Sequence, residues 1–429
     1  MIQVLSGAWA LLLGMMLLQV GNGMQSTLLG IRGELEGFSA FEMSLVMAGY
    51  FVGFLFGSRM APEMIRRVGH VRVFAALASL ISAVMILYPA LPDIWAWGAG
   101  RVLIGFCFSG VYVTAESWLN NAATNETRGK ALSLYMIVQM VGIVSAQALM
   151  LVADPAGFIL FIIPSVLVSL SFAPILLSIS PTPAYGTAKP MSLAQIMRVS
   201  PLGCVGMFLL GGVFSAQFGM APVFGAEAGL SVAQISTFVA TFFVGAVVLQ
   251  YPIGWLSDRL DRRVLILATA VIAGGGALVG LLLGGFFWAL LLAGFMIGGM
   301  SNPLYALLIA YTNDFLTHDD MAAASGGMVF INGLGAVAGP LVTGWLMGMI
   351  GPRGFFLFIA GLMLAMAGYA AYRMTQRAAP APDETESYAP VVPSASPVSV
   401  ELAQEYATWA AQDDQDDPGP RDAGSSTAV

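Results

Sequence analysis

The chain alternates between long apolar runs and short polar stretches. A helix of about 20 apolar residues crosses the hydrocarbon core of a bilayer, and runs of this length fall at residues 4–29, 40–61, 72–91, 94–116, 131–152 and 157–180, then at 200–223, 232–257, 264–285, 287–311, 321–350 and 354–372. Backbone polar groups in lipid must be satisfied within the segment, so these runs predict helices rather than an open sheet. The pattern predicts an all-α integral membrane protein with twelve transmembrane helices.

The polar stretch 181–199, which carries three prolines, separates two sets of six runs. We therefore predict an N-terminal six-helix half at residues 1–180, a linker at 181–199, a C-terminal half at 200–375 and a tail at 376–429. The tail is rich in Pro, Ala, Ser and acidic residues, a composition typical of disorder. A short induced helix is the alternative there, because Val398, Leu402, Tyr406 and Trp409 share one helical face.

Composition supports the membrane class, and the position of the acidic residues explains the negative net charge. Hydrophobic residues make up 58% of the chain and charged residues 10%, against roughly 25% charged residues in soluble domains. The net charge of −7 comes from the tail, because ten of the 24 acidic residues lie beyond residue 377, where Arg421 is the only base. The remaining body carries 16 basic against 14 acidic residues. The acidity therefore indicates nothing about the charge of a ligand.

Positive charges are distributed unequally between the two sides of the predicted bundle. An even number of helices puts both termini on one side, and that side also carries the linker and fourteen of the basic residues. The opposite side carries Arg32 and Arg353, and Arg101 lies within a span. Basic residues collect in cytoplasmic loops, so we predict cytoplasmic termini and a cytoplasmic linker.

The two halves repeat at an offset of 192 or 193 residues. Gly53 and Gly245 are each followed, 13 and 14 residues later, by a charged pair, Arg66-Arg67 in the first half and Asp258-Arg259 in the second. Further matches pair Gln25 with Gln217, Tyr112 with Tyr305, Gln139 with Asn332, and Gly142 with Gly335. Two parallel repeats with a site between them are a transporter architecture.

The charged segments carry a family resemblance. The segment Gly254–Arg263 resembles the loop signature G-x-L-a-D-r-x-G-r-r of the major facilitator superfamily (MFS), with Asp261 in place of its second glycine. The first copy, at 62–70, has Pro62 in place of the first glycine and Arg66 in place of the aspartate. The resemblance covers about residues 1–375. Ala115–Leu119, followed by Arg128-Gly129-Lys130 and Tyr135-Met136, is similar to the bacterial YcaD-type branch.

We predict a substrate site between the halves. Its candidates are the polar residues of the pore-facing helices together with the buried base, namely Asn22, Gln25, Arg101, Tyr112, Gln139, Gln217, Asn302, Tyr305 and Asn332. Hydrogen bonding between helices is the alternative for each polar residue. Arg101 followed by Gly105 resembles a motif of the superfamily that is linked to proton coupling or substrate contact. The alternative for Arg101 is a side chain that reaches the outer headgroups.

A second set, of eight charged residues and one glycine, is predicted to control conformation rather than to bind substrate. Its members are Arg66, Arg67, Glu116, Arg128, Gly254, Asp258, Arg259, Arg262 and Asp314. Glu116 lies about 22 Å along the helix axis from Arg101, at the cytoplasmic interface, where we expect it to pair with the 2–3 loop arginines and Arg128. Arg66 is expected to pair with Glu116 or Asp314. Asp314 is the expected partner of the Asp258 region.

The sequence contains no phosphate loop, metal-ligand cluster or nucleophile triad, and His70 and His318 are both expected in loops. We predict no enzymatic activity, no cofactor, no metal and no nucleic-acid partner. The resemblance implies a secondary transporter of the bacterial inner membrane that moves a small solute by rocker-switch alternating access. A coupling proton is also implied, with a facilitator, or coupling through interfacial Glu116, as the alternatives left open. The competing hypothesis is a non-transporting sensor or scaffold of the same fold that acts through its cytoplasmic tail, whose partner the sequence leaves open.

Overall fold

The computed structural model describes residues 2–122, 125–177, 191–376, 388, 391, 396, 398–400, 403 and 404. Within these residues every regular element is a helix, so the predicted all-α class is confirmed. The side chains at 2–8, 120–130, 318, 319 and 322 lie outside the description.

Two sets of helices follow one another along the chain. The N-terminal half contains α1 (Ile2–Leu35), α2 (Ala40–Val68), α3 (His70–Ala90), α4 (Ile94–Ala122), α5 (Asn125–Leu149), α6 (Ile159–Ser171) and α7 (Ala173–Leu177). After the short α8 (Leu193–Val199), the C-terminal half contains α9 (Pro201–Ser215), the π-helix η1 (Ala216–Met220), α10 (Ala221–Glu227), α11 (Val232–Ser257), α12 (Arg262–Leu283), α13 (Phe287–Asn313), α14 (His318–Ile350) and α15 (Arg353–Gln376).

The helical segments match the twelve predicted spans. Eleven segments of the described chain are long and apolar enough to cross a membrane, counting α6–α7 and α9–η1–α10 as one segment each. The twelfth is α1, a 34-residue helix in which Gln19, Asn22 and Gln25 interrupt the apolar run. The helices extend past the apolar runs, so Arg66 and Arg67 lie on the last turn of α2 rather than in a loop. His70 and His318, expected in loops, are the first residues of α3 and α14.

Local sequence explains where the equivalent helices α2 and α11 begin. Ser39 accepts a hydrogen bond from the Glu42 N–H, and the Glu42 side chain accepts one from the Ser39 N–H, which forms a capping box. Ser231 and Gln234 form the same box 192 residues later. Each box satisfies two of the N–H groups that a helix start leaves free. The internal repeat therefore includes the signal that starts its helices.

Glycines bring helices into backbone contact in both halves. A Cβ at Gly53 of α2 would lie 1.8 Å from the carbonyl oxygen of Val102 in α4. In the C-terminal half, a Cβ at Gly245 of α11 would lie 2.4 Å from the carbonyl oxygen of Phe295 in α13. Small residues let membrane helices approach to backbone contact. The repeated Gly53 and Gly245 are therefore packing residues.

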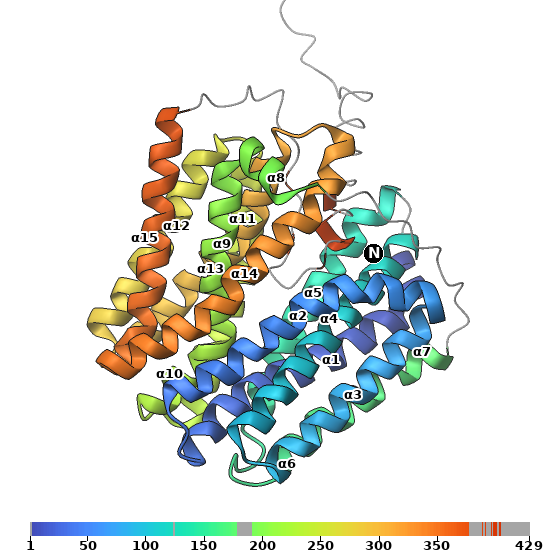
Figure 1. Ribbon diagram of the computed structural model, residues 1–429, viewed down its shortest axis with the longest axis vertical. Coiled ribbons are helices and arrows are strands. Elements are labelled where there is room, and N and C mark those ends of the chain that lie inside the picture. The colour runs from blue at the N-terminus through green and yellow to red at the C-terminus, as the bar shows by residue number, and fades with distance from the viewer. Residues whose placement is uncertain are drawn as a thin grey trace, which may run out of the picture.

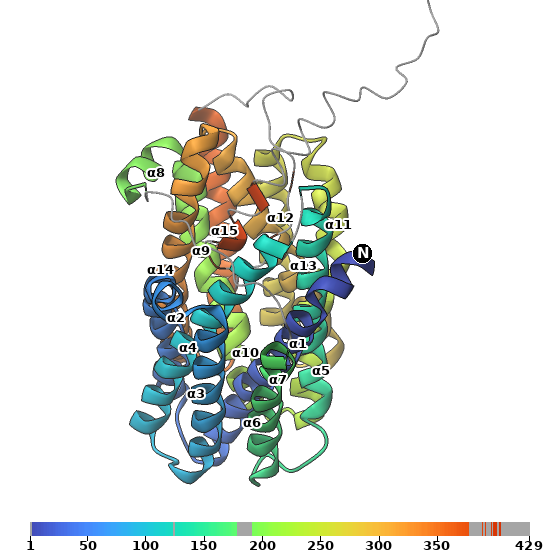
Figure 2. The same cartoon turned by 90° about the vertical axis from the view of Figure 1, so that its right-hand side faces the viewer.

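The halves lie side by side, with α1–α7 at lower right and α9–α15 at upper left in Figure 1; Figure 2 gives the view at right angles. One face carries the α1–α2 and α10–α11 turns, and we call it the loop face. The other carries α8 and the last turns of α11, α13 and α15, and we call it the terminal face. Near the loop face the halves touch directly, because Ser26 donates to the Phe218 carbonyl at 3.0 Å and a Cβ at Gly219 would lie 3.2 Å from the Met47 Cβ.

Part of the predicted tail has a defined place on the helices. Tyr388 is half-buried, and Val391, Ser396, Val400 and Ala403 are buried. The expectation of disorder does not hold for these residues. Residues 398–400 and 403–404 are helical, as the alternative of an induced helix required, although Leu402, Tyr406 and Trp409 lie outside the described residues.

Candidate functional site

A cavity lies between the halves and is lined by side chains from both. Its polar lining residues are Gln19, Asn22, Tyr50, Tyr112, Asn302 and Asn332, and its aromatic lining residues include Phe51, Phe54, Phe214, Phe218 and Phe243. No aspartate, glutamate, lysine or arginine is among the residues that line it. The centres of water molecules can occupy about 40 Å³ of it, which is room for about three waters. The cavity is therefore uncharged, rich in rings and narrow in this conformation.

Gln19 on α1 joins three helices of the N-terminal half. Its amide nitrogen donates to the Gln139 side-chain oxygen on α5 at 2.9 Å, and its oxygen accepts from the Tyr112 hydroxyl on α4 at 2.8 Å. One turn along α1, the Asn22 amide donates to the hydroxyls of Tyr112 at 3.3 Å and Tyr50 at 3.4 Å. Each amide can serve as both donor and acceptor, so these residues form one connected network on the cavity wall.

Arg101 lies behind this wall. Its side chain is 0% exposed, its Nη1 donates to the Gln25 side-chain oxygen at 2.8 Å, and its guanidinium lies 4.8 Å from the centre of the Tyr50 ring. Its Nε and Nη2 are buried without a hydrogen-bond partner among the described residues. Buried charge costs free energy unless it is paired. The Tyr50 ring therefore connects an incompletely satisfied cation to the cavity network.

The C-terminal half contributes separate polar groups rather than a network. The Asn302 amide donates to the Gly298 carbonyl at 3.1 Å, and the Asn332 amide donates to the Met207 carbonyl at 3.0 Å. Gln217, in η1, donates to the Ser301 hydroxyl at 2.9 Å. The side-chain oxygens of Asn302 and Asn22 are buried without a partner in the described chain. Both side chains line the cavity, so two amide oxygens without a partner in the described chain belong to its lining residues.

Family models and relatives agree with this architecture. The model described as Major Facilitator Superfamily matches residues 11–231 and again residues 203–410, one match over each half. The chain belongs to the Major Facilitator Superfamily. An "Uncharacterized MFS-type transporter YcaD" of Salmonella arizonae is 24% identical over 356 residues, covering 82% of this chain and 92% of the relative. The YcaD protein of Escherichia fergusonii is 26% identical over 357 residues with the same coverage. The predicted resemblance to the YcaD-type branch is confirmed.

Solved MFS structures share the fold. The nucleoside transporter NupG (D323A mutant) superposes with a TM-score of 0.71 at 14% identity, covering 85% of this chain and 98% of that one. A bacterial homologue of the human lysosomal transporter Spinster, solved in an inward-facing and unoccupied conformation, has a TM-score of 0.67 at 14% identity, covering 95% and 98%.

The structure places the nine predicted substrate residues of this MFS chain in three groups. Asn22, Tyr112, Asn302 and Asn332 line the cavity. Gln139 lies one hydrogen bond behind the wall, next to Gln19. Gln25, Arg101, Gln217 and Tyr305 are buried but do not line the cavity. Whether any of them contacts substrate remains a prediction.

The prediction missed Gln19 and Tyr50. Gln19 lies three residues before Asn22 on α1, so helical spacing could have placed both on one face. Tyr50 was visible only as part of the YFVG segment. The bulk of the cavity rings come from phenylalanines, which sequence reasoning could not separate from packing residues.

The charged residues of the first MFS signature do not pair as expected. Arg66 and Arg67, with side chains 70% and 74% exposed, both bond to Glu63 on the same helix rather than to Glu116 or Asp314. An i,i+4 pair at the surface forms without any long-range contact. Glu116 instead accepts from the Tyr135 hydroxyl at 3.2 Å and from the N–H of Ser396 in the tail at 3.0 Å. The side chain of Arg128, its other expected partner, lies outside the description.

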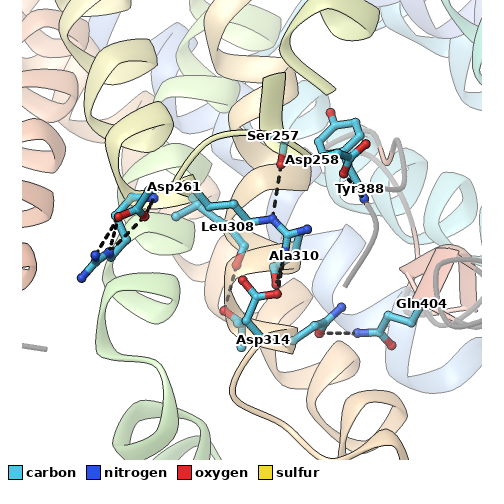
Figure 3. Close-up of polar contacts among 12 residues, drawn as sticks. Ser257, Asp258, Asp261, Leu308, Ala310, Asp314, Tyr388 and Gln404 are labelled. Atoms are coloured by element: carbon cyan, nitrogen blue, oxygen red, sulfur yellow. Dashed lines mark hydrogen bonds and ion pairs between the residues drawn. The ribbon is translucent and has the colours of Figure 1, made fainter. Parts of the chain in front are cut away.

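The second signature is anchored within the C-terminal half (Figure 3). Arg262 forms an ion pair with Asp314, as expected of that pair, with side chains 3% and 2% exposed. Arg259 lies over the Trp255 ring at 4.2 Å. Asp261, in the place of the signature glycine, accepts from the Arg263 N–H at 2.9 Å and caps α12. An aspartate satisfies the first N–H groups of a helix, which explains why this departure is tolerated.

Gly254 and Asp258 contact the tail. Asp258 accepts from the Tyr388 N–H at 2.8 Å, and a Cβ at Gly254 would lie 2.7 Å from the Tyr388 ring. Burial raises the pKa of the Asp258 carboxyl above its usual range, against the lowering effect of the Tyr388 N–H bond and the nearby Arg262. The gating role of Gly254 and Asp258 stays a prediction. Their contact with the tail was not predicted from the sequence.

Proposed function

We propose that this MFS protein is a secondary transporter that moves a small, uncharged solute bearing a flat ring across the bacterial inner membrane by rocker-switch alternating access. The observation that carries the proposal is the cavity between the halves, lined by amides, hydroxyls and aromatic rings from both halves and by no charged side chain. An ionised solute would lose its hydration there without gaining a counter-charge. Rings and amides favour a neutral molecule that stacks and hydrogen-bonds.

The terminal face is proposed to be cytoplasmic. It carries Arg66, Arg67, Arg259, Arg262 and Arg263, and basic residues collect on the cytoplasmic side. With that orientation, the halves touch directly near the periplasmic face through the Ser26–Phe218 and Met47–Gly219 contacts. Closure at the periplasmic face supports an inward-facing assignment for this conformation.

Glu116 is the proposed group for proton coupling. It is buried, and it lies four residues beyond the cavity residue Tyr112 on α4, which is about 6 Å along the helix. The lining of the cavity itself offers no carboxylate. A proton taken up at Glu116 would therefore act beside the solute site rather than within it. A facilitator without coupling is the competing outcome.

A binding screen followed by transport measurements would test the proposal. Purified protein would first be tested for thermal stabilisation by neutral ring-bearing solutes, including nucleosides because NupG is titled a nucleoside transporter, with charged analogues of the same ring as matched controls. Solutes that stabilise would then be measured in proteoliposomes with and without a pH gradient. We expect neutral compounds to bind and move; stabilisation by charged analogues alone, or no transport of any stabilising solute, would refute the proposal.

A further inference from the structure

The tail contacts both halves at the terminal face. Tyr388 donates its N–H to Asp258 and accepts a hydrogen bond at its hydroxyl from Gln250 at 2.8 Å, both on the α11 side. Gln404 donates to the Asn313 side-chain oxygen on α13 at 2.9 Å. Figure 3 shows Tyr388 beside Asp258 and Gln404 reaching toward the end of α13 near Asp314. These contacts fix the tail to the half from which it extends.

Ser396 makes a contact with the other half. Its N–H donates to Glu116 of α4 at 3.0 Å, and its hydroxyl donates to the same carboxylate oxygen. Ser396 is 0% exposed and Glu116 is 1% exposed. A buried carboxylate needs several donors, and here the tail supplies most of those that the structure describes. Ser396 therefore joins the C-terminal half to the N-terminal half, together with a backbone hydrogen bond from Ser399 to Glu116.

These contacts lie beyond the cavity on the terminal side. Glu116 is four residues past Tyr112 on α4, about 6 Å along the axis. On α11, Gln250 is seven residues past the lining residue Phe243, about 10 Å, and on α13, Asn313 is eleven residues past Asn302, about 16 Å. The three helices run from the cavity to the terminal face, so the tail covers the space between the cavity and that face.

We infer that the terminal face carries a peptide-binding site between the halves, occupied by the described residues of the chain's own tail between Tyr388 and Gln404, and that the docked tail inhibits the transport cycle. Closing the terminal face would bring the ends of α4, α11 and α13 together in the space that Ser396, Val400 and Ala403 now fill. The tail must therefore leave before that face can close. The site stands on the contacts alone, whereas the inhibition rests on the proposed transport function.

The site can be tested in the full chain with a thiol reporter. Ser399 is 5% exposed, and Ser399→Cys changes one atom. The native Cys107 and Cys204 are buried, so their failure to react with a polar maleimide reports that the body stays folded. We expect the thiol of the Ser399→Cys variant to react slowly while the tail is docked. Fast labelling at the rate of an exposed cysteine, without any further change, would overturn the site.

Either of two further substitutions, each added to the Ser399→Cys variant, should release the tail. Ser396→Asp places a carboxylate against Glu116, and Gly254→Ala places a methyl group 2.7 Å from the Tyr388 ring. Each is expected to raise the labelling rate at 399 at least tenfold. Gly275→Ala is the matched control, because a Cβ there meets nothing within 4 Å, and it should leave the rate unchanged. Equal rates in Ser396→Asp and the parent would overturn the site.

Inhibition is tested separately in proteoliposomes. Ser396→Asp should transport several-fold faster than the chain with Ser396, because its terminal face can close. An unchanged or lower rate, with the tail shown to be released by labelling, would overturn the inhibition but leave the site. If no variant transports any solute while labelling still differs, the proposed function fails and the site stands.

Discussion

Gln19 is the residue on which the cavity network depends. It bonds both Gln139 and Tyr112, and each loses a partner when the amide is removed. Gln19 and Asn22 were within reach of sequence reasoning through their spacing on one helix. The face of α1 that meets the cavity could not be predicted, because the sequence pattern does not reveal which helices are the neighbours of α1.

We predict that Gln19→Leu raises the KM for the transported solute about tenfold, since about 1.4 kcal/mol of hydrogen bonding is lost from the cavity wall. Gln147→Leu is the matched control. Gln147 accepts from Thr27 at 3.1 Å across the same helix pair, away from the cavity. Initial rates in proteoliposomes measure both, and equal KM values for the two variants would contradict the role of Gln19.

Arg101 gives a second prediction at this scale. Arg101→Ala should abolish transport without reducing membrane insertion, because the variant removes the cation behind Tyr50 and frees Gln25. Arg353→Ala, at the exposed start of α15, is the control and should transport normally. Transport would be compared at equal membrane content by immunoblot. Normal transport by Arg101→Ala would remove this residue from the site.

At the scale of the element, the helix pairs α2–α4 and α11–α13 are built on glycine contacts. The repeat of Gly53 and Gly245 was visible in the chain, and their approach to backbone carbonyls gives it a cause. Other element features were not predictable. The break of helix six at Phe172 and the π-helix at Ala216–Met220 interrupt continuous apolar runs, and local propensity carries no signal for a change of helix type that packing imposes.

Substitution at the α2–α4 crossing should destabilise the N-terminal half. Gly53→Leu is predicted to lower the free energy of unfolding by about 2–3 kcal/mol, because a side chain there forces α2 away from α4. Gly98→Leu on α4 meets no atom within 4 Å at its Cβ and should have little effect. Thermal denaturation in detergent compares the two variants. Equal melting temperatures would show that the close approach of α2 and α4 at Gly53 does not determine the stability of the protein.

At the scale of the whole molecule, the halves meet directly near the loop face and are bridged by the tail at the terminal face. Rocker-switch transport requires the loop-face contacts to separate in every cycle. The position of a Cβ at Gly219 lies 3.2 Å from the Met47 Cβ, close to the 3.5–4.5 Å that a disulfide spans. This pair is therefore suited to locking the loop face shut.

We predict that the double variant Met47→Cys with Gly219→Cys loses transport on oxidation and regains it on reduction. Each single variant, treated in the same way, should be insensitive to oxidant. Solute uptake measured before and after reductant gives the result. Full transport by the cross-linked double variant, with the disulfide confirmed by mass spectrometry, would exclude separation of the loop face as part of the cycle.

The sequence by itself determined the membrane class, the twelve helices, the repeat and the superfamily, because twenty-residue apolar runs have one stable form in lipid and the repeat is written in the order of residues. Only the tertiary structure decided which polar residues share the cavity and that Ser396 reaches Glu116. These outcomes depend on which helices become neighbours. Contacts between residues 280 apart in the chain leave no local pattern from which they could be predicted.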